Sequence, residues 1–198
     1  MEIVAYTVAA VALLGSPGPG IAALVAIGRR RGLRRSLGFF AALQAGLAIA
    51  AGLSALGIGA LIAAAPGLVA ALTAASVAYL LWLAWSTASA PVAADPGERD
   101  DSAAWRPWGG FLLGIANPKA YLAFASLMGS FVLAAPRFGP ADTVAKWLVC
   151  ILVIFAVDIA WLWAGAGIGR LSFSPRGERA MNLAMGGAIA AAAVAPLL

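Results

Sequence analysis

Long apolar stretches alternate with short polar ones along the whole chain. Six stretches are predominantly apolar, and they cover approximately residues 3–28, 37–63, 67–88, 108–134, 143–166 and 180–197. A helix needs roughly 20 apolar residues to cross the hydrocarbon core of a bilayer. The pattern therefore predicts an all-α integral membrane protein with six transmembrane helices.

Two of these stretches, the first and the fourth, contain residues that break helices. Pro17, Gly18, Pro19 and Gly20 interrupt the first, and Asn117-Pro118-Lys119 interrupts the fourth. Proline removes a backbone donor and glycine weakens a helix. Broken helices are tolerated at membrane depth only where protein or a water-filled cavity surrounds the exposed backbone. We therefore expect broken helices 1 and 4, each facing the interior of the protein.

The six predicted spans divide into two sets of three within a single transmembrane domain, 1–198. Repeat one covers 1–88, a loop predicted to be cytoplasmic covers 89–107, and repeat two covers 108–198. Because three is an odd number of crossings, the second set must be inverted relative to the first. Equivalent breaks in two inverted halves are typical of transporters whose binding site lies near the midplane.

Composition supports a membrane protein and excludes several other classes. Hydrophobic residues make up 63% of the chain and charged residues 11%, whereas about a quarter of an ordinary soluble domain is charged. The net charge of +5 comes from basic residues placed between apolar stretches, so we predict no nucleic-acid partner. The chain has no histidine and one cysteine, and it contains neither a phosphate-binding loop nor a His-Glu-x-x-His motif. We therefore predict no enzyme activity, no metal site and no cofactor.

The distribution of arginine predicts the orientation in the membrane. The first, third and fifth loops hold five, two and three arginines, whereas the second and fourth loop regions hold only Arg137 and Lys146. The positive-inside rule then places the odd loops in the cytoplasm and both termini outside. Met1-Glu2 lacks the positive start of a cleaved signal peptide, so the first span is expected to be retained. The seven tryptophans, Trp105 among them, are interpreted as interfacial anchors.

Lys119 and Asp158 are the two charged residues that fall deep inside predicted spans, both near the midplane, whereas Lys146 lies at the membrane edge. Charged groups at that depth are costly and mark transport pathways. The hypothesis is that Asp158 couples transport to protons while Lys119 pairs with it or holds a substrate carboxylate. The alternative is a permanent ion pair that fastens two spans. The full set of candidate substrate- or ion-binding residues is Pro17, Gly18, Pro19, Gly20, Gln44, Asn117, Pro118, Lys119 and Asp158.

Three of these candidates have alternatives that the sequence leaves open. The break at Gly18 can bind an anion through its free amides, or can be a packing kink. Asn117 can contact substrate, or cap the helix that follows it. Gln44 can line the cavity, or form a hydrogen bond between helices.

Motifs in both halves resemble the LysE/RhtB family of amino-acid exporters. They are Pro17-Gly18-Pro19, the basic loop through Gly32, the run 78–83 (AYLLWL) and the run 111–120 (FLLGIANPKA). The resemblance implies a bacterial inner-membrane carrier that expels amino acids or small derivatives, driven by the proton or cation gradient. Gly20 stands where relatives often have a polar residue, which leaves the substrate undetermined.

The sequence is also compatible with other membrane functions. An exporter of another small solute or cation, or a passive channel, would share the same hydropathy pattern. The expected partners are a small-molecule substrate and the lipid bilayer, and faces rich in glycine and alanine would suit a homodimer.

Overall fold

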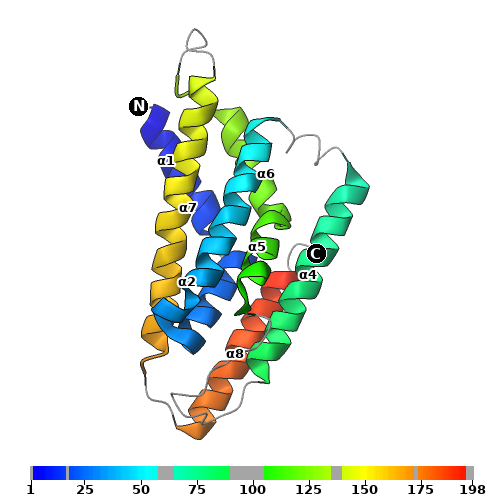
Figure 1. Ribbon diagram of the computed structural model, residues 1–198, viewed down its shortest axis with the longest axis vertical. Coiled ribbons are helices and arrows are strands. Elements are labelled where there is room, and N and C mark those ends of the chain that lie inside the picture. Colours follow the sequence, from blue (N-terminus) through cyan, green and yellow to red (C-terminus); the bar gives the residue numbers. More distant parts are fainter. Residues whose placement is uncertain are drawn as a thin grey trace.

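The computed structural model describes residues 2–16, 18–57, 65–89, 105–134, 140–171 and 174–194. Pro17 and most of the predicted loop 89–107 lie outside these residues. The described ranges form seven helices and no strand, which confirms the prediction of an all-α protein. The helices are α1 (Glu2–Gly15), α2 (Pro19–Ala55), α4 (Pro66–Ala88), α5 (Pro107–Ile115), α6 (Pro118–Ser130), α7 (Ala141–Ile168) and α8 (Pro175–Val194). They run mainly along the long axis of the molecule (Figure 1).

Proline sets the start of most of these helices. α2, α4, α5, α6 and α8 each begin at a proline, namely Pro19, Pro66, Pro107, Pro118 and Pro175. The first helical position suits proline because its missing N–H would have no partner there and its fixed φ already matches the helix. Both predicted breaks arise in this way, since Pro19 and Pro118 each start a new helix after an interruption.

The helix α2 contains a reversal of chain direction at Gly32. Gly32 has φ +67°, in the left-handed region that glycine adopts without strain. The two halves, 19–31 and 33–55, meet α7 in opposite order. In the first half the partners are Val25 with Gly165 and Arg29 with Gly169, and in the second they are Phe40 with Phe155 and Ala48 with Trp147. The half 19–31 therefore runs in the direction of α7, and the half 33–55 runs against it.

By length and composition, two of the described helices could cross a membrane, α2 and α7. The pair α5 and α6 adds a third if the two are counted as one span bent by 49°. Large apolar side chains such as Val8, Leu152 and Trp163 are exposed on the outer surface, which suits contact with lipid. The described residues thus form an apolar helical membrane protein.

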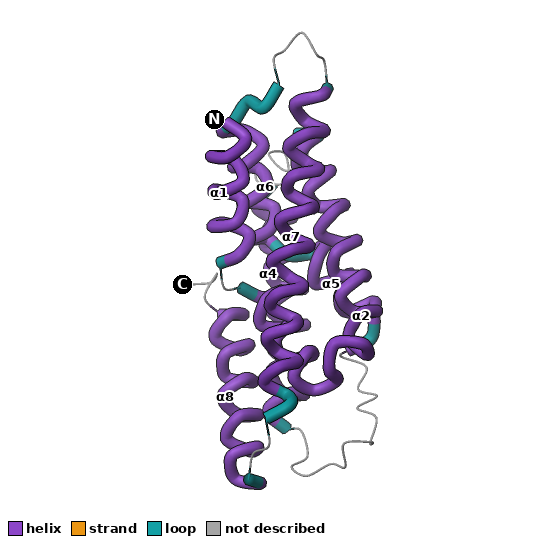
Figure 2. Tube along the Cα trace, turned by 90° about the vertical axis from the view of Figure 1, so that its left-hand side faces the viewer, coloured by secondary structure: helices purple, strands orange, loops and turns teal. Residues whose placement is uncertain are grey.

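Each broken segment lies beside a continuous helix. α1 runs in the same direction as α7, because Tyr6 bonds to the Lys146 carbonyl and Gly15 packs against Val157. α5 runs in the same direction as the half 33–55 of α2, with the pairs Gly110 with Phe39 and Gly114 with Leu43. Because α7 and the half 33–55 are antiparallel, α1 and α5 run in opposite directions. Figure 2 shows the helices as a bundle from a second side.

Close approach of α2 to α7 depends on glycine. A Cβ added to Gly165 would meet the Val25 carbonyl oxygen and would lie 2.8 Å from the Val25 Cα. A Cβ added to Gly167, two residues further on, would meet no atom within 4 Å. Gly165 thus permits backbone contact between the helices, as small residues do in membrane bundles.

We expect Gly165→Leu to lower stability strongly and Gly167→Leu to leave it nearly unchanged. Overpacking a tight interface costs about 1–3 kcal/mol, and here the obstacle is rigid backbone. The measurement is the yield and thermal midpoint of detergent-purified protein. Equal midpoints for the two variants would show that the α2–α7 contact is not this close.

Basic residues gather at the end of the bundle that includes the reversal at Gly32. Arg29 is buried, and its Nη1 and Nη2 donate to Asn182 Oδ1 at 2.6 Å and Glu178 Oε1 at 2.9 Å. Arg30 Nη1 donates to the Ser86 carbonyl at the end of α4. These bonds tie α2 to α8 and α4, a role that the arginine pattern alone did not indicate.

Trp105 differs from the prediction of an interfacial anchor. Its side chain is almost completely buried, packs edge-on against Phe39 and lies under the Arg30 guanidinium, which is 5.9 Å from its ring centroid. Arg31 donates to its carbonyl. The anchor interpretation is therefore wrong for Trp105, because the residue turns inward just before α5 begins.

A second polar network lies toward the end of the bundle opposite to Gly32. Lys146 is buried, forms an ion pair with Asp142 at 2.7 Å, and donates to the Met128 carbonyl at 2.9 Å. Asp142 Oδ1 accepts hydrogen bonds from the amides of Leu133 and Ala134. The network joins the start of α7 to the end of α6 and the segment after it.

Candidate functional site

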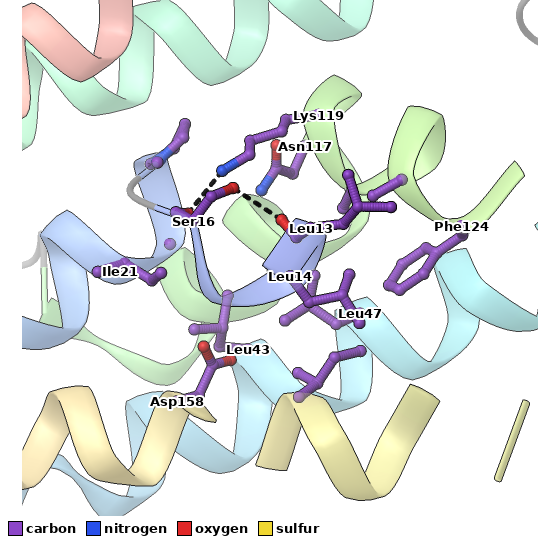
Figure 3. A pocket seen from close by; sticks show the side chains of 16 residues that line it. Leu13, Leu14, Ser16, Ile21, Leu43, Leu47, Asn117, Lys119, Phe124 and Asp158 are labelled. Carbon is purple, nitrogen blue, oxygen red and sulfur yellow. Dashed lines mark hydrogen bonds between the residues drawn. The ribbon is translucent and has the colours of Figure 1, made fainter. Parts of the chain in front are cut away.

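A pocket lies where the break between α1 and α2 meets the break between α5 and α6 (Figure 3). It holds about 490 Å³ of space between atoms, including its open mouth. Its lining comes from α1, both halves of α2, α6 and α7, and comprises Leu13, Leu14, Ser16, Gly18, Pro19, Gly20, Ile21, Leu43, Leu47, Asn117, Lys119, Ala120, Ala123, Phe124, Ile154 and Asp158. The two breaks, more than 95 residues apart in sequence, therefore face one space.

Lys119 connects the two breaks. Its Nζ donates to the carbonyl of Ser16 at 2.6 Å, so a residue in the first turn of α6 binds the backbone at the end of α1 (Figure 3). Gly18 leaves room for this contact, because a Cβ there would lie 2.8 Å from Nζ. The Lys119 ammonium group thus supplies a donor to the Ser16 carbonyl, which lacks a helical partner because the helix is broken there.

Asp158 is buried in the middle of α7, with 6% of its surface exposed. Its Oδ2 accepts a hydrogen bond from Gln44 Nε2 at 2.7 Å. Gln44 does not line the pocket, so the hydrogen bond between helices is the role that the structure supports for it. The bond orients the Asp158 carboxylate from the second half of α2.

Lys119 and Asp158 do not form an ion pair with each other in the described part of the chain. Lys119 reaches Ser16 and Asp158 reaches Gln44. Figure 3 shows Lys119 and Asn117 on one side of the end of α1, and Asp158 on the other. The structure does not contain the permanent ion pair considered as an alternative. Instead, one cation and one anion line the same pocket on different sides.

Asn117 occupies the position before α6 but its side chain caps nothing. Its backbone carbonyl accepts from the amides of Ala120 and Tyr121, whereas its side chain makes no capping bond. The Oδ1 atom is buried and has no hydrogen-bond partner within the described residues. The capping interpretation is therefore wrong for the side chain. A buried polar atom without a partner is unfavourable and calls for a ligand or a water molecule.

The starts of two helices also face the pocket. At α2, the Ala22 amide bonds to the Gly18 carbonyl, so the amides of Gly20 and Ile21 belong to the first turn, which lacks acceptors within the helix. At α6, the Lys119 amide has the same position. The partial positive charge of helix starts favours an anion nearby. Pro118 begins α6 but is not part of the lining.

Nine residues were predicted from the sequence to bind substrate or ions, and six of them line the pocket: Gly18, Pro19, Gly20, Asn117, Lys119 and Asp158. Sequence reasoning missed the apolar part of the lining. Helical spacing offered a signal, because Ala123 follows Lys119 by one turn and Ile154 precedes Asp158 by one turn. Within the described ranges, no group of three or more His, Cys, Asp or Glu residues is placed to hold a metal.

Broken helices that meet at a pocket lined by a half-buried lysine and a buried aspartate are typical of a membrane transporter. The chain belongs to the LysE type translocator family, whose model matches residues 11–195. The family membership agrees with the resemblance seen in the motifs and identifies a translocator rather than an enzyme.

Individual relatives are distant. The chain is 28% identical to a cysteine/O-acetylserine efflux protein of Escherichia coli O1:K1 / APEC, over 79% of this chain and 78% of that protein. It is 26% identical to a protein of the same name from Salmonella choleraesuis (strain SC-B67), over 76% and 75% of the two chains. No solved structure matches the chain.

Proposed function

We propose that this protein is a secondary exporter of amino acids or small amino-acid derivatives across the bacterial inner membrane, coupled to the proton or cation gradient. The observation that carries the proposal is the pocket between the two helix breaks, which places Lys119, two helix starts and Asp158 around one space. An amino acid is a zwitterion, with a carboxylate for the cationic side and an ammonium group for Asp158. The names of the efflux proteins similar to this chain support the same class of substrate.

The membrane architecture in this proposal is six spans arranged as two inverted repeats. The opposite directions of α1 and α5, and the reversal of the chain at Gly32, support it. Each broken span then lies along the second helix of the other repeat. The end at which Arg29, Arg30 and Arg31 make their contacts is the cytoplasmic end, so both termini lie outside.

In this mechanism Asp158 couples the outward movement of the substrate to the inward movement of a proton. A carboxylate that loses its cation, or moves into a desolvated state, binds a proton more readily. Exchange of a substrate ammonium for a proton at Asp158 would link outward movement of substrate to inward movement of the proton. Gln44 would hold the carboxylate in position in both states.

The test is efflux of a panel of amino acids and their O-acyl derivatives from loaded cells or proteoliposomes, with and without an uncoupler. We expect export that exceeds that of empty-vector cells and falls to the background level when the uncoupler is present. Export that ignores the gradient would indicate a passive channel. Absence of export for every member of the panel would contradict the proposed function.

A further inference from the structure

Part of the pocket lining is apolar and lies apart from Lys119 and Asn117 (Figure 3). Lys119 and Asn117 lie on one side of the end of α1 and Asp158 on another, whereas Leu47 and Phe124 lie together away from these groups (Figure 3). We call Leu14, Leu47, Phe124 and Ile154 the apolar wall. Phe124 and Leu47 are buried, so the wall belongs to the packed interior and not to the lipid-facing surface.

The lining carries one positive and one negative side chain, which matches the two charges of a zwitterion. Lys119 and Asp158 are the only ionisable side chains among the lining residues of the described chain. Asp158 Oδ2 accepts from Gln44, while its Oδ1 accepts no hydrogen bond from any described residue. A substrate that placed its carboxylate toward Lys119 and the start of α2, and its ammonium at Asp158, would use both charges.

A charged side chain on the substrate would then have no partner. A basic side chain would need a second carboxylate, and an acidic one a second cation, and the apolar wall offers neither. Burying an unpaired charge is unfavourable, whereas an aliphatic side chain gains from contact with apolar surface. The small residues Ala120 and Ala123 leave space for such a side chain beside Phe124.

We infer that the pocket selects zwitterionic amino acids with uncharged, mainly apolar side chains, and that the apolar wall is the specificity determinant. The inference rests on the proposed function and adds the substrate class to it. The unsatisfied Oδ1 of Asn117 lacks a donor at the edge of the pocket, which a water molecule bound beside the substrate would supply. The wall discriminates by charge, and it discriminates only weakly between aliphatic side chains that differ by one methylene group.

The experiment measures export of neutral, basic and acidic amino acids by the wild-type protein and by Leu47→Asp, with Leu47→Asn as the matched uncharged control. For the wild type we expect neutral substrates to exceed lysine and glutamate by about tenfold or more. Leu47→Asp supplies a second carboxylate in the wall and should raise the ratio of lysine to neutral export by about tenfold, as expected for a new charge pair in a buried site. Leu47→Asn adds a polar group without a charge and should change that ratio much less than Leu47→Asp does.

A binding measurement on the purified wild type keeps the inference testable if Leu47→Asp does not fold. Leucine and methionine should raise the thermal midpoint, and lysine and glutamate should not. Export or stabilisation by lysine or glutamate equal to that by neutral amino acids overturns the inference and leaves amino-acid export intact. No export of any amino acid overturns the proposed function and the inference together.

Discussion

Asp158→Asn is expected to abolish gradient-driven export while leaving the amount of folded protein unchanged. Asparagine has the shape of aspartate and can still accept the hydrogen bond from Gln44, so the contact between α2 and α7 is retained. It carries no charge and exchanges no proton. The variant loses the proposed charge pair between Asp158 and the substrate ammonium. Loss of one partner of a buried charge pair costs about 2–5 kcal/mol, so we expect a fall of about 100-fold in the rate of export per folded molecule.

The measurement is efflux of a neutral amino acid from cells with matched expression, with and without an uncoupler. Glu2→Gln is the control, because Glu2 is an exposed carboxylate at the start of α1, far along the helix from the break. Asp158→Glu should restore part of the activity. Uncoupler-sensitive export by Asp158→Asn at the wild-type rate would remove Asp158 from the coupling mechanism.

Lys119→Met is expected to reduce export by about 100-fold as well, because it deletes the cation that we propose faces the substrate carboxylate. The same change removes the hydrogen bond to the Ser16 carbonyl, so part of the effect will appear as lower stability. Lys119→Arg retains the charge and should keep more activity than Lys119→Met. Export must therefore be expressed per folded molecule, with protein amount and thermal midpoint measured for each variant.

Gly18→Ala tests the position of the Lys119 ammonium without removing its charge. The new Cβ would lie 2.8 Å from Nζ and would displace it, and a small misplacement in a binding site can cost about 100-fold in rate. Gly129→Ala is the matched control on α6, since a Cβ there meets no atom within 4 Å. If Lys119→Met and Gly18→Ala both export normally per folded molecule, Lys119 serves only to join the two breaks.

Hydropathy and proline positions predicted much of the backbone. The stretches 67–88 and 143–166 closely match α4 and α7, and both interruptions fall at the starts of new helices. These features are local, because the number of apolar residues fixes the length of a helix and proline fixes its start. The reversal at Gly32 was also signalled locally, by a basic loop with a glycine.

The contacts between helices could not be predicted in the same way. The sequence left open whether Lys119 pairs with Asp158 or holds a substrate carboxylate, and in the structure each has another partner, the Ser16 carbonyl and Gln44 respectively. Trp105 was expected to be an interfacial anchor and instead lies buried, and the ion pair of buried Lys146 with Asp142 was not predicted. Which side chains meet depends on how each helix is rotated about its axis and how closely it packs against its neighbours. Neither property can be predicted from the sequence of one helix alone.

The sequence by itself determined that this protein is a helical membrane protein with breaks in its first and fourth apolar stretches, and it supplied the motifs of its family. The tertiary structure decided that both breaks open onto one pocket, that Gln44 orients Asp158, and that an apolar wall completes the site. The physical reason is that hydrophobicity and helix-breaking residues act over a few turns of chain. The pocket, in contrast, depends on backbone contact between helices distant in sequence, made possible at Gly165, Gly28 and Gly114 by the absence of a side chain.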